Sequence, residues 1–243
     1  WLEVTCVTIP TAKLDRPVRI VLLSDLQVDA PGSYEEDALR RAAAANPDIV
    51  LFSGDYVQVP GIERYTAAAA ALNKLLKRSG LKAPLGMYAV AGDTDRPLLW
   101  QQVMEGLPVR LAVISSEFDA GPVVVTTLSR ADSRKTNLHV SGKAKFHIVL
   151  GHAPDFGLGM VEADLLMAGH THGGQVRLPF IGPVMTLSNV PRKWAAGVNE
   201  ISAGKWLVVS RGIGMERGMA PRLRFRCRPE IVIVDLVPTE GRK

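Results

Sequence analysis

The sequence predicts an α/β fold built from two stacked β-sheets with helices on their outer faces. Strand-like and helix-like segments alternate in the first half of the chain, and short β-rich runs dominate from Val109 onward. Several hydrophobic runs end directly in acidic or imidazole side chains, which is typical of open α/β sheets that carry chemistry at their strand ends. With 243 residues, of which 47% are hydrophobic, the chain can bury a full core.

The elements can be placed in order from hydrophobic periodicity and stop signals. Strands are expected at residues 2–9, 18–24, 48–53, 86–90, 123–128, 148–150, 165–168, 206–209 and 231–236. Helices are expected at 34–45, 63–78 and 97–105, and the first two end before the stop signals 46–47 (Asn-Pro) and 79–80 (Ser-Gly). The alanine run 67–71 is interpreted as the close-packed face of the second helix, because alanine has the best helix propensity.

The chain is predicted to form a single domain over residues 1–243. No internal repeat, long Ser/Gly stretch or block of like charge divides it. The sequence motifs described next also extend from near the N-terminus to the last third of the chain, so one folded unit must contain them all.

The most informative segment is 168–175, Ala-Gly-His-Thr-His-Gly-Gly-Gln, which follows an apolar run. Residues two apart in an extended segment project to the same side, so His170 and His172 can bind one group together. Flanking glycines allow the backbone to approach a ligand closely. Two histidines alone are a weak signal, because surface pairs are common.

Four further hydrophobic runs end in the same style. They lead into Asp25-Leu26-Gln27, Gly54-Asp55, Gly92-Asp93-Thr94-Asp95 and Gly151-His152. Each motif taken alone has an ordinary interpretation as a helix cap or a turn. Taken together they are better explained by one site, since carboxylate and imidazole are the ligands of divalent metals. The remaining histidines, His139 and His147, are interpreted as structural.

The ordered set of motifs resembles that of the calcineurin-like metallophosphoesterases over nearly the whole chain. Segments 173–179, 188–193 and 210–214 are similar to the membrane-associated bacterial branch, which includes phosphodiesterases of lipid headgroups. The resemblance implies the four-layer αββα sandwich of that family, with two mixed sheets flanked by helices.

The resemblance also implies two metal ions. Asp25, Gln27 and His172 would hold the first, Asp55 would bridge, and Asp93, His152 and His170 would hold the second. Two positions depart from the family pattern, because Gln27 stands where the family has His and Asp93 where it has Asn. An amide oxygen is a weak donor for zinc or iron, and an added carboxylate favours hard cations. Manganese is therefore favoured, with magnesium, zinc and iron as alternatives, and site one is expected to be the weaker. Asp29 is either a substitute ligand for the missing His or part of a turn.

The expected reaction is hydrolysis of a phosphoester by a hydroxide that bridges the two metals. Asp55, Asp93 and His152 are the expected catalytic residues, and Asp95 is expected to orient the loop of Asp93. Thr94 replaces the family His that assists the leaving group, and it can only donate a hydrogen bond. Good leaving groups, such as aryl or pyrophosphate-linked ones, should therefore react faster than alkyl diesters. Thr94 and Arg211 are candidate contacts to the substrate.

The chain is basic, with a net charge of +5 and a pI near 9.4. Four arginines alternate with apolar residues over 222–228, so an extended chain would place the arginines on one face. This pattern fits either an edge strand kept soluble by charge or a basic surface for anionic lipid headgroups, with Met215 and Met219 nearby. Nucleic acid is not favoured, because aromatic residues are 6% and no stacking platform accompanies the basic residues.

The chain begins at Trp1 and contains no run of about 18 apolar residues, so no membrane span or signal peptide is expected within it. The resemblance implies an anchor that precedes this segment in the full-length protein and a location at the membrane surface, with the cytoplasm as the alternative. Cys6 and Cys227 are expected to be buried free thiols. A monomer is expected.

The predicted function is that of a metal-dependent phosphodiesterase or pyrophosphatase that acts on lipid or nucleotide-diphosphate headgroups. Two alternatives remain open at this point. One is a catalytically weak metal-binding module of the same fold, which the changes at Gln27 and Thr94 suggest, and the other is a nuclease.

Overall fold

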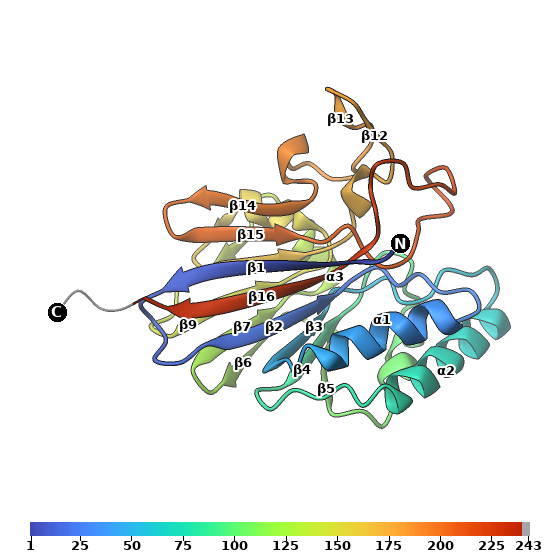
Figure 1. Cartoon of the computed structure of the whole chain (residues 1–243), viewed down its shortest axis with the longest axis horizontal. Coiled ribbons are helices and arrows are strands. Elements are labelled where there is room, and N and C mark those ends of the chain that lie inside the picture. Colours follow the sequence, from blue (N-terminus) through green and yellow to red (C-terminus); the bar gives the residue numbers. More distant parts are fainter. Residues whose placement is uncertain (240–243) are drawn as a thin grey trace.

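The structure is a computed structural model that describes residues 1–239. It contains two six-stranded sheets that face each other (Figure 1). The first has the order β1 (Glu3–Thr11), β16 (Glu230–Pro238), β2 (Val18–Leu23), β3 (Ile49–Phe52), β4 (Met87–Val90) and β5 (Val109–Ala112). The second has the order β14 (Gly197–Ser202), β15 (Lys205–Val209), β11 (Leu165–Ala168), β9 (Phe146–Leu150), β7 (Val123–Thr127) and β6 (Ser116–Ala120). The expected strands are thus present within one or two residues of their ends.

Parallel pairing dominates the centre of both sheets. Strands β2 to β5 run parallel, and so do β7, β9, β11 and β15, whereas β6 and β14 are antiparallel edge strands. Two short ribbons lie outside the sheets, β8 (His139–Val140) with β10 (Met160–Val161) and β12 (Arg177–Leu178) with β13 (Gly182–Pro183). The parallel strands β2, β3, β4, β9 and β11 deliver their carboxyl ends to one edge of the structure, which is where α/β folds place their sites.

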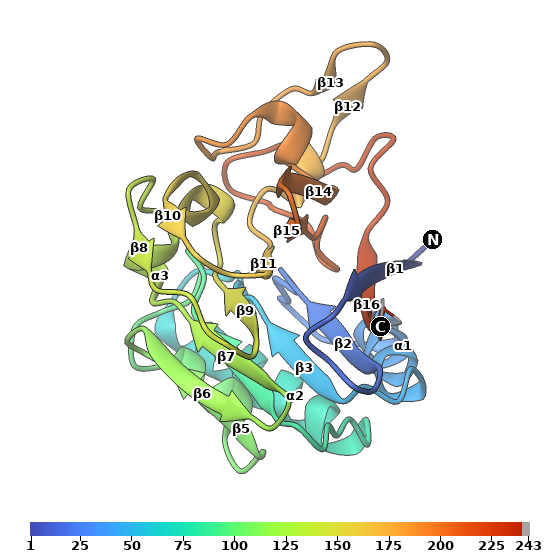
Figure 2. The same ribbon diagram turned by 90° about the vertical axis from the view of Figure 1, so that its left-hand side faces the viewer.

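Helices cover the outer face of the first sheet, as Figure 2 shows. They are α1 (Ser33–Ala44) and α2 (Ile62–Arg78), close to the expected ranges. Helix α2 buries Ala68, Ala69, Leu72 and Leu76, so the alanine run does supply part of a packed face. Together with apolar side chains of β2, β3 and β4, the two helices form one hydrophobic cluster, and a second cluster fills the space between the sheets. The α/β sandwich predicted from the sequence is confirmed.

The outer face of the second sheet is covered more thinly than expected. Short elements lie over it: α3 (Arg130–Ser133), the 3₁₀ helices η2 (Pro154–Leu158) and η4 (Arg192–Trp194), and the β8–β10 ribbon. The helix expected at 97–105 is also shorter, because only the 3₁₀ helix η1 (Trp100–Met104) forms there. Leu98 adopts φ 63° just before it, a backbone conformation that no α-helix contains.

The alternating segment 222–228 is not a strand, so the interpretation as an edge strand is wrong, and its four arginines do not share one face. Arg224 is only 7% exposed, whereas Leu223 and Phe225 are exposed, which reverses the expected faces. The Arg224 guanidinium points inward and donates to the carbonyl oxygen of Gly214. A single bridge of Phe225 to Val176 is the only ladder contact that the described residues show for this segment. The inward arginine breaks the two-residue period because the chain here is looped rather than extended.

The other sequence expectations about single residues are partly confirmed. His147 is buried and bonded to Thr126 Oγ1 (2.8 Å), which supports its structural role. Both cysteines are free, but only Cys227 is buried, because the side chain of Cys6 faces solvent from the edge strand β1. Among the described residues, no helix combines the length and apolar composition needed to cross a bilayer.

Candidate metal centre

Five turns that follow parallel strands meet at one edge of the two sheets. Backbone hydrogen bonds join these turns directly, from Asp25 N to Gly54 O (3.1 Å), from Gln27 N to Asp55 O (2.8 Å) and from Gly169 N to a carbonyl of the turn after β9 (2.9 Å). Each turn carries one of the motifs that the sequence places directly after a strand. The fold therefore brings the motifs together.

One cluster contains Asp93, His152 and His170, whose nearest side-chain ligand atoms all lie within 4.8 Å of one another. Asp93 Oδ2 is 3.4 Å from His152 Nε2 and 3.1 Å from His170 Nδ1. The other ring nitrogens donate to main-chain carbonyls, His152 Nδ1 to Ser53 (2.7 Å) and His170 Nε2 to Leu187 (2.9 Å). In the neutral rings these bonds place the proton on the nitrogen that faces the carbonyl, so the nitrogen that faces Asp93 offers its lone pair to a cation.

A second cluster contains Asp25, Asp55 and His152, again within 4.8 Å. His172 belongs to its surroundings, since its Nε2 is 3.7 Å from Asp25 Oδ1. His152 is the residue that the two clusters share, and its Nε2 is 3.6 Å from Asp55 Oδ2. Both oxygens of Asp25 accept from the main-chain N–H of His170 (3.1 Å), which holds the carboxylate in place.

Gln27 reaches the same cluster through its amide. Its Nε2 donates to Asp55 Oδ2 (3.3 Å) and to Glu216 Oε2 (3.0 Å). Sequence reasoning missed Glu216, although it is the one acidic residue between positions 212 and 229 of a strongly basic stretch. Asp29 does not reach the clusters, because its carboxylate is exposed and pairs with Arg217 (3.4 Å), so the interpretation as part of a turn agrees with the structure.

The residues of both clusters fit a pair of divalent metal ions. Gln27 Oε1, His152 Nε2 and His172 Nε2 are buried and have no hydrogen-bond partner within residues 1–239. Buried polar atoms are nearly always satisfied, so the unpaired Gln27 Oε1 and His152 Nε2 beside the buried carboxylates of Asp25 and Asp55 point to a ligand that accepts lone pairs. Carboxylate, imidazole and amide oxygen are donors that divalent metals use.

The electrostatics of the clusters also call for a cation. Burial raises the pKa of the Asp25 carboxyl to about 6. Burial opposes the charged form of His152, but Asp55 and Asp93 outweigh it and raise the pKa of this imidazole to about 10. Burial lowers the pKa of His172 well below its usual range, so this ring is neutral. Binding of a metal ion to His152 must therefore release the proton of this imidazole. The metal ion would then take the place of the imidazolium as the positive charge beside the buried carboxylates.

Asp95 connects the turns after β3 and β4, as expected for a residue that orients the loop of Asp93. Its Oδ2 accepts from the N–H groups of Asp55 and Gly92 (both 2.8 Å), and its Oδ1 accepts from Tyr56 N (2.9 Å). Thr94 acts on Asp55 through its backbone, because Thr94 N donates to Asp55 Oδ1 (2.8 Å). The Thr94 hydroxyl is buried without a hydrogen-bond partner among the described residues.

The arginine that lines the cavity is not the one expected from the sequence. Arg211, the candidate phosphate contact, pairs with Glu3 (2.7 Å) and Glu230 and does not line the cavity at the clusters. Arg134 lines that cavity instead, and its Nε and Nη2 bond both oxygens of Asp93. Hydrogen bonds from His152 and His170 and the Arg134 guanidinium outweigh burial and hold the pKa of Asp93 well below its usual range. No motif surrounds Arg134, so the sequence contains no signal for it.

His172 contacts Arg224, one of the four arginines that the sequence was expected to place on one face of an extended segment. Arg224 Nη2 lies 3.1 Å from His172 Nδ1, and a guanidinium can only donate. The ring proton of His172 therefore lies on Nε2 in this structure, and coordination through Nε2 would require that proton to move to Nδ1.

The backbone at the candidate ligands is unusual. Five of these ligand residues adopt positive φ: Asp25, Gln27, Asp55, His170 and His172. Non-glycine residues rarely adopt this conformation, and it clusters at functional sites. Close packing adds a further constraint, because a Cβ at Gly169 would lie 1.8 Å from Ser24 Oγ and 2.4 Å from an Asp25 carboxylate oxygen.

A cavity of about 690 Å³ opens onto the clusters. Its polar wall includes Asp55, Asp93, Thr94, Arg134, His170 and His172. Its other wall is apolar and comes from two loops that follow the site, with Val184, Met185, Leu187, Met219, Ala220 and Pro221. A volume of this size suits a ligand with both a charged and an apolar part.

Comparison with known proteins agrees with this geometry. The model of the calcineurin-like phosphoesterase family matches residues 18–174, which is more than half of the chain and includes every strand-end motif. Phosphodiesterase YaeI of Escherichia coli K12 is 29% identical over 91% of this chain and 83% of its own. The uncharacterized metallophosphoesterase YkuE of Bacillus subtilis is 28% identical over 80% of this chain and 70% of its own. UDP-2,3-diacylglucosamine pyrophosphatase LpxG of Chlamydia muridarum is 24% identical over 89% and 83%. The chain belongs to the calcineurin-like phosphoesterase family and is a metal-dependent phosphoric ester hydrolase.

Proposed function

We propose that the protein hydrolyses a phosphodiester or pyrophosphate bond in a substrate that has both a phosphorylated headgroup and an apolar tail. The observation that carries the proposal is the cavity, in which two metal-type clusters form one wall and aliphatic side chains form the other. A lipid or a nucleotide-diphosphate-linked lipid has this combination. The relatives support the reaction class, since one is named a phosphodiesterase and another a pyrophosphatase of a diacylated sugar nucleotide.

The proposal assigns Asp25, Gln27 and His172 to one metal and Asp93, His152 and His170 to the other, with Asp55 between them. When bound, such a pair supplies an activated water and neutralises charge on the phosphoryl oxygens. Manganese is favoured, because three carboxylates and an amide oxygen form a hard donor set. The side chains here prepare the site, since Ser53 and Leu187 fix imidazole tautomers and Asp95 fixes the loop of Asp93.

Arg134 and Thr94 are proposed to face the substrate phosphoryl group. Arg134 is the cation on the polar wall of the cavity, and its planar guanidinium suits two phosphoryl oxygens. The buried hydroxyl of Thr94 has no partner within residues 1–239, so it is available as a donor. It cannot protonate a leaving group near neutral pH. Substrates with good leaving groups are therefore expected to react fastest.

The proposed substrate also bears on location. A substrate with an apolar tail resides in a bilayer, so we propose that the protein works at a membrane surface.

The first experiment measures hydrolysis of bis(p-nitrophenyl) phosphate by metal-stripped protein titrated with manganese, magnesium and zinc. The matched control is Asp55→Ala, which removes the carboxylate between the two clusters. Activity that returns with manganese and is absent from the control supports the proposal. No activity with any metal would favour a metal-binding module that has lost catalysis.

A second experiment tests the leaving-group argument by comparing an aryl diester with a glycerol diester. The native protein should hydrolyse the aryl diester faster, and Thr94→His should raise the glycerol rate more than the aryl rate. Equal native rates on the two diesters would overturn the argument.

A further inference from the structure

The β12–β13 hairpin and the loop beside it expose an unusual number of apolar side chains. Nine of the 18 exposed large hydrophobic residues in the described chain lie within 178–187 and 219–225. Phe180 at the hairpin tip is fully exposed, and Ile181 beside it is 59% exposed. Phe180 also adopts φ 65°, a conformation that is rare for a bulky residue.

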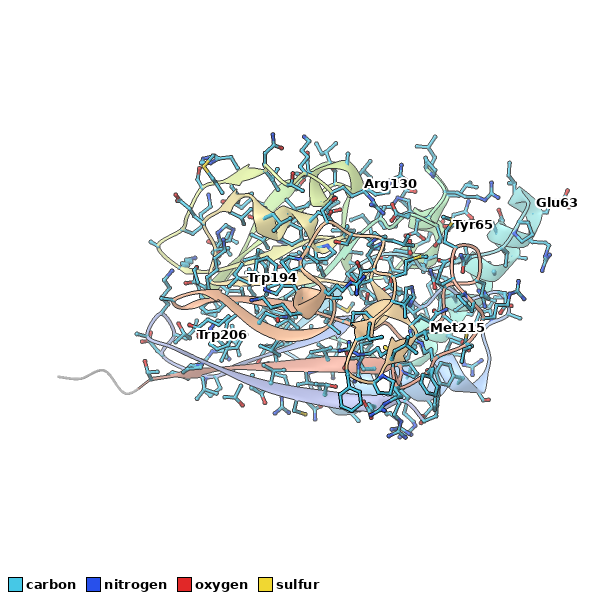
Figure 3. All side chains as sticks on the ribbon, turned by 90° about the horizontal axis from the view of Figure 1, so that it is seen from above. Glu63, Tyr65, Arg130, Trp194, Trp206 and Met215 are labelled. Carbon is cyan, nitrogen blue, oxygen red and sulfur yellow. The ribbon has the colours of Figure 1, made fainter. Side chains whose placement is uncertain are left out.

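The hairpin and the loop form one projecting surface. Phe225 N donates to Gln175 O and Arg177 N donates to Phe225 O, both at 3.0 Å, so the loop is fastened to the base of the hairpin. The hairpin projects from the body of the molecule in both ribbon views (Figures 1 and 2). Viewed from above, Met215 of the loop lies toward the same end of the molecule as Tyr65, away from Trp206 (Figure 3).

Charge is distributed to match a negatively charged partner. Segments 176–199 and 217–229 contain eight of the 29 Lys and Arg residues and none of the 24 Asp and Glu residues. The remaining chain, with 21 basic against 24 acidic residues, is therefore acidic by three. Arg177, Arg192, Lys193 and Arg226 line a shallow hollow around the hairpin that contains no acidic residue. Within the described residues none of these four forms an ion pair, whereas most surface arginines elsewhere do.

We propose that this surface, formed by residues 177–193 and 219–226, docks on an anionic lipid bilayer, with Phe180 and Ile181 inserted among the acyl chains and the four basic side chains against the headgroups. Apolar tips ringed by arginine and lysine bind lipid surfaces in this way. The same two loops form the apolar wall of the cavity, through Met185 and Met219, so a docked molecule opens its cavity toward the bilayer. The proposed function explains why the protein would dock on a bilayer, but the docking itself does not depend on it, because lipid binding does not require hydrolysis.

Sedimentation with vesicles tests the docking. The probes are vesicles of phosphatidylcholine alone and of phosphatidylcholine mixed with phosphatidylglycerol. Native protein should bind the mixed vesicles, and binding should fall as salt is added. The double variant Phe180→Ser with Ile181→Ser and the variant Arg192→Glu with Lys193→Glu should each bind roughly tenfold more weakly. Ile114→Ser, an equally exposed apolar residue in the β5–β6 loop, is the matched control and should bind normally.

Failure of the docking and failure of the proposed function give different results. Hydrolysis of the soluble aryl diester should be equal in the native protein and in all three variants. Normal hydrolysis without vesicle binding would overturn the docking and leave the function intact, whereas vesicle binding without hydrolysis would do the reverse. Loss of a dimer in the Phe180 variant, with vesicle binding unchanged, would identify a second copy of the chain as the occupant and overturn the docking.

A separate observation concerns Gln27 and Glu216. Gln27 is 1% exposed, and its Oε1 has no hydrogen-bond partner among the described residues. Its Nε2 donates to Glu216 Oε2 (3.0 Å) and, at a longer distance, to Asp55 Oδ2 (3.3 Å). The other oxygen of Glu216 accepts from Gln58 Nε2 (2.8 Å) and Met219 N (2.9 Å), which anchors the carboxylate on its loop.

We infer that Glu216 is a positioning residue that turns the carbonyl oxygen of Gln27 toward the metal. A carboxylate can only accept, so it selects the NH₂ end of the amide and leaves Oε1 for the cation. An imidazole at position 27 would not need a neighbour to choose between an oxygen and a nitrogen end, whereas the amide of Gln27 does.

Calorimetric titration of metal-stripped protein with manganese tests the inference. Gln27→Ala and Glu216→Gln should each weaken one of two manganese sites by roughly tenfold and leave the other unchanged. The double variant should be no weaker than Gln27→Ala, because Glu216 acts through Gln27. The electron paramagnetic resonance spectrum of coupled manganese should be lost at the same metal concentration in all three variants. A site lost in Glu216→Gln but kept in Gln27→Ala would make Glu216 itself the ligand and overturn the inference.

Discussion

Replacing Arg134 with alanine should tighten metal binding while weakening the binding of an anionic substrate. The Arg134 guanidinium bonds both oxygens of Asp93, and one of them, Oδ2, is the atom that faces His152 and His170. A metal at this cluster must therefore share Oδ2 with the guanidinium or displace it. Removal of Arg134 eliminates the competitor and leaves the Asp93 charge uncompensated, and both changes favour the cation.

The size of the effect follows from exposure. The side chains of Arg134 and Asp93 are 40% and 30% exposed, so water screens the pair. Exposed ion pairs contribute up to about 1 kcal/mol, which corresponds to roughly fivefold tighter binding of manganese. Loss of a bidentate phosphoryl contact should raise KM by roughly tenfold, since bonds to charged groups are worth about 1.5 kcal/mol or more.

Calorimetry with manganese gives the metal affinity, and steady-state hydrolysis of the aryl diester gives KM. Arg130→Ala is the matched control, because Arg130 is an exposed arginine of α3 without an ion pair in the part of the chain that the structure describes. Its values should equal those of the native protein. Weaker manganese binding in Arg134→Ala, or an unchanged KM, would refute the reasoning that places the guanidinium between metal and substrate.

Two further outcomes are expected. Burial lowers the pKa of His147, so as the pH drops the unfolded chain binds a proton at this residue before the folded protein does. The free energy of unfolding should therefore fall as the pH drops through about 6.5. In urea titrations His147→Gln should weaken this pH dependence, and the same dependence in native protein and variant would contradict the expectation. Gly169→Ala should abolish manganese binding and lower the melting temperature, because the added Cβ would lie 1.8 Å from Ser24 Oγ. A variant with the manganese affinity and melting temperature of the native protein in calorimetry would show that the turn can shift to accept the methyl group.

The candidate ligands at the strand ends could be predicted from the sequence because each directly follows a hydrophobic run that forms a buried strand. Asp25 and Asp55 lie within three residues of the ends of β2 and β3, which pair in parallel and so bring these two side chains together. His152 follows β9 of the second sheet, so it reaches them only because the two sheets stack. The family resemblance then assigned them to metals, which the two observed clusters support.

Residues that reach the site from loops could not be predicted in this way. Arg134 follows a four-residue helix, and its contact with Asp93 depends on how the second sheet packs on the first. The period of two over 222–228 misled for a similar reason, since a tertiary contact with His172 pulls Arg224 inward and overrides the local pattern. Hydrophobic patterns indicate which face of a helix or strand is apolar. They do not predict which distant residues the side chains of an irregular loop contact.

The positive φ angles at Asp25, Gln27, Asp55, His170 and His172 place the ligands in conflict with the stability of the chain. Each such residue costs on the order of 1 kcal/mol, so the five together approach the total stability of a typical domain, which is about 5–15 kcal/mol. Glycine at these positions would relieve the cost and remove a ligand. A population of variants selected for heat resistance alone should therefore lose its metal ligands first, and relatives that have abandoned catalysis should be more thermostable than this enzyme.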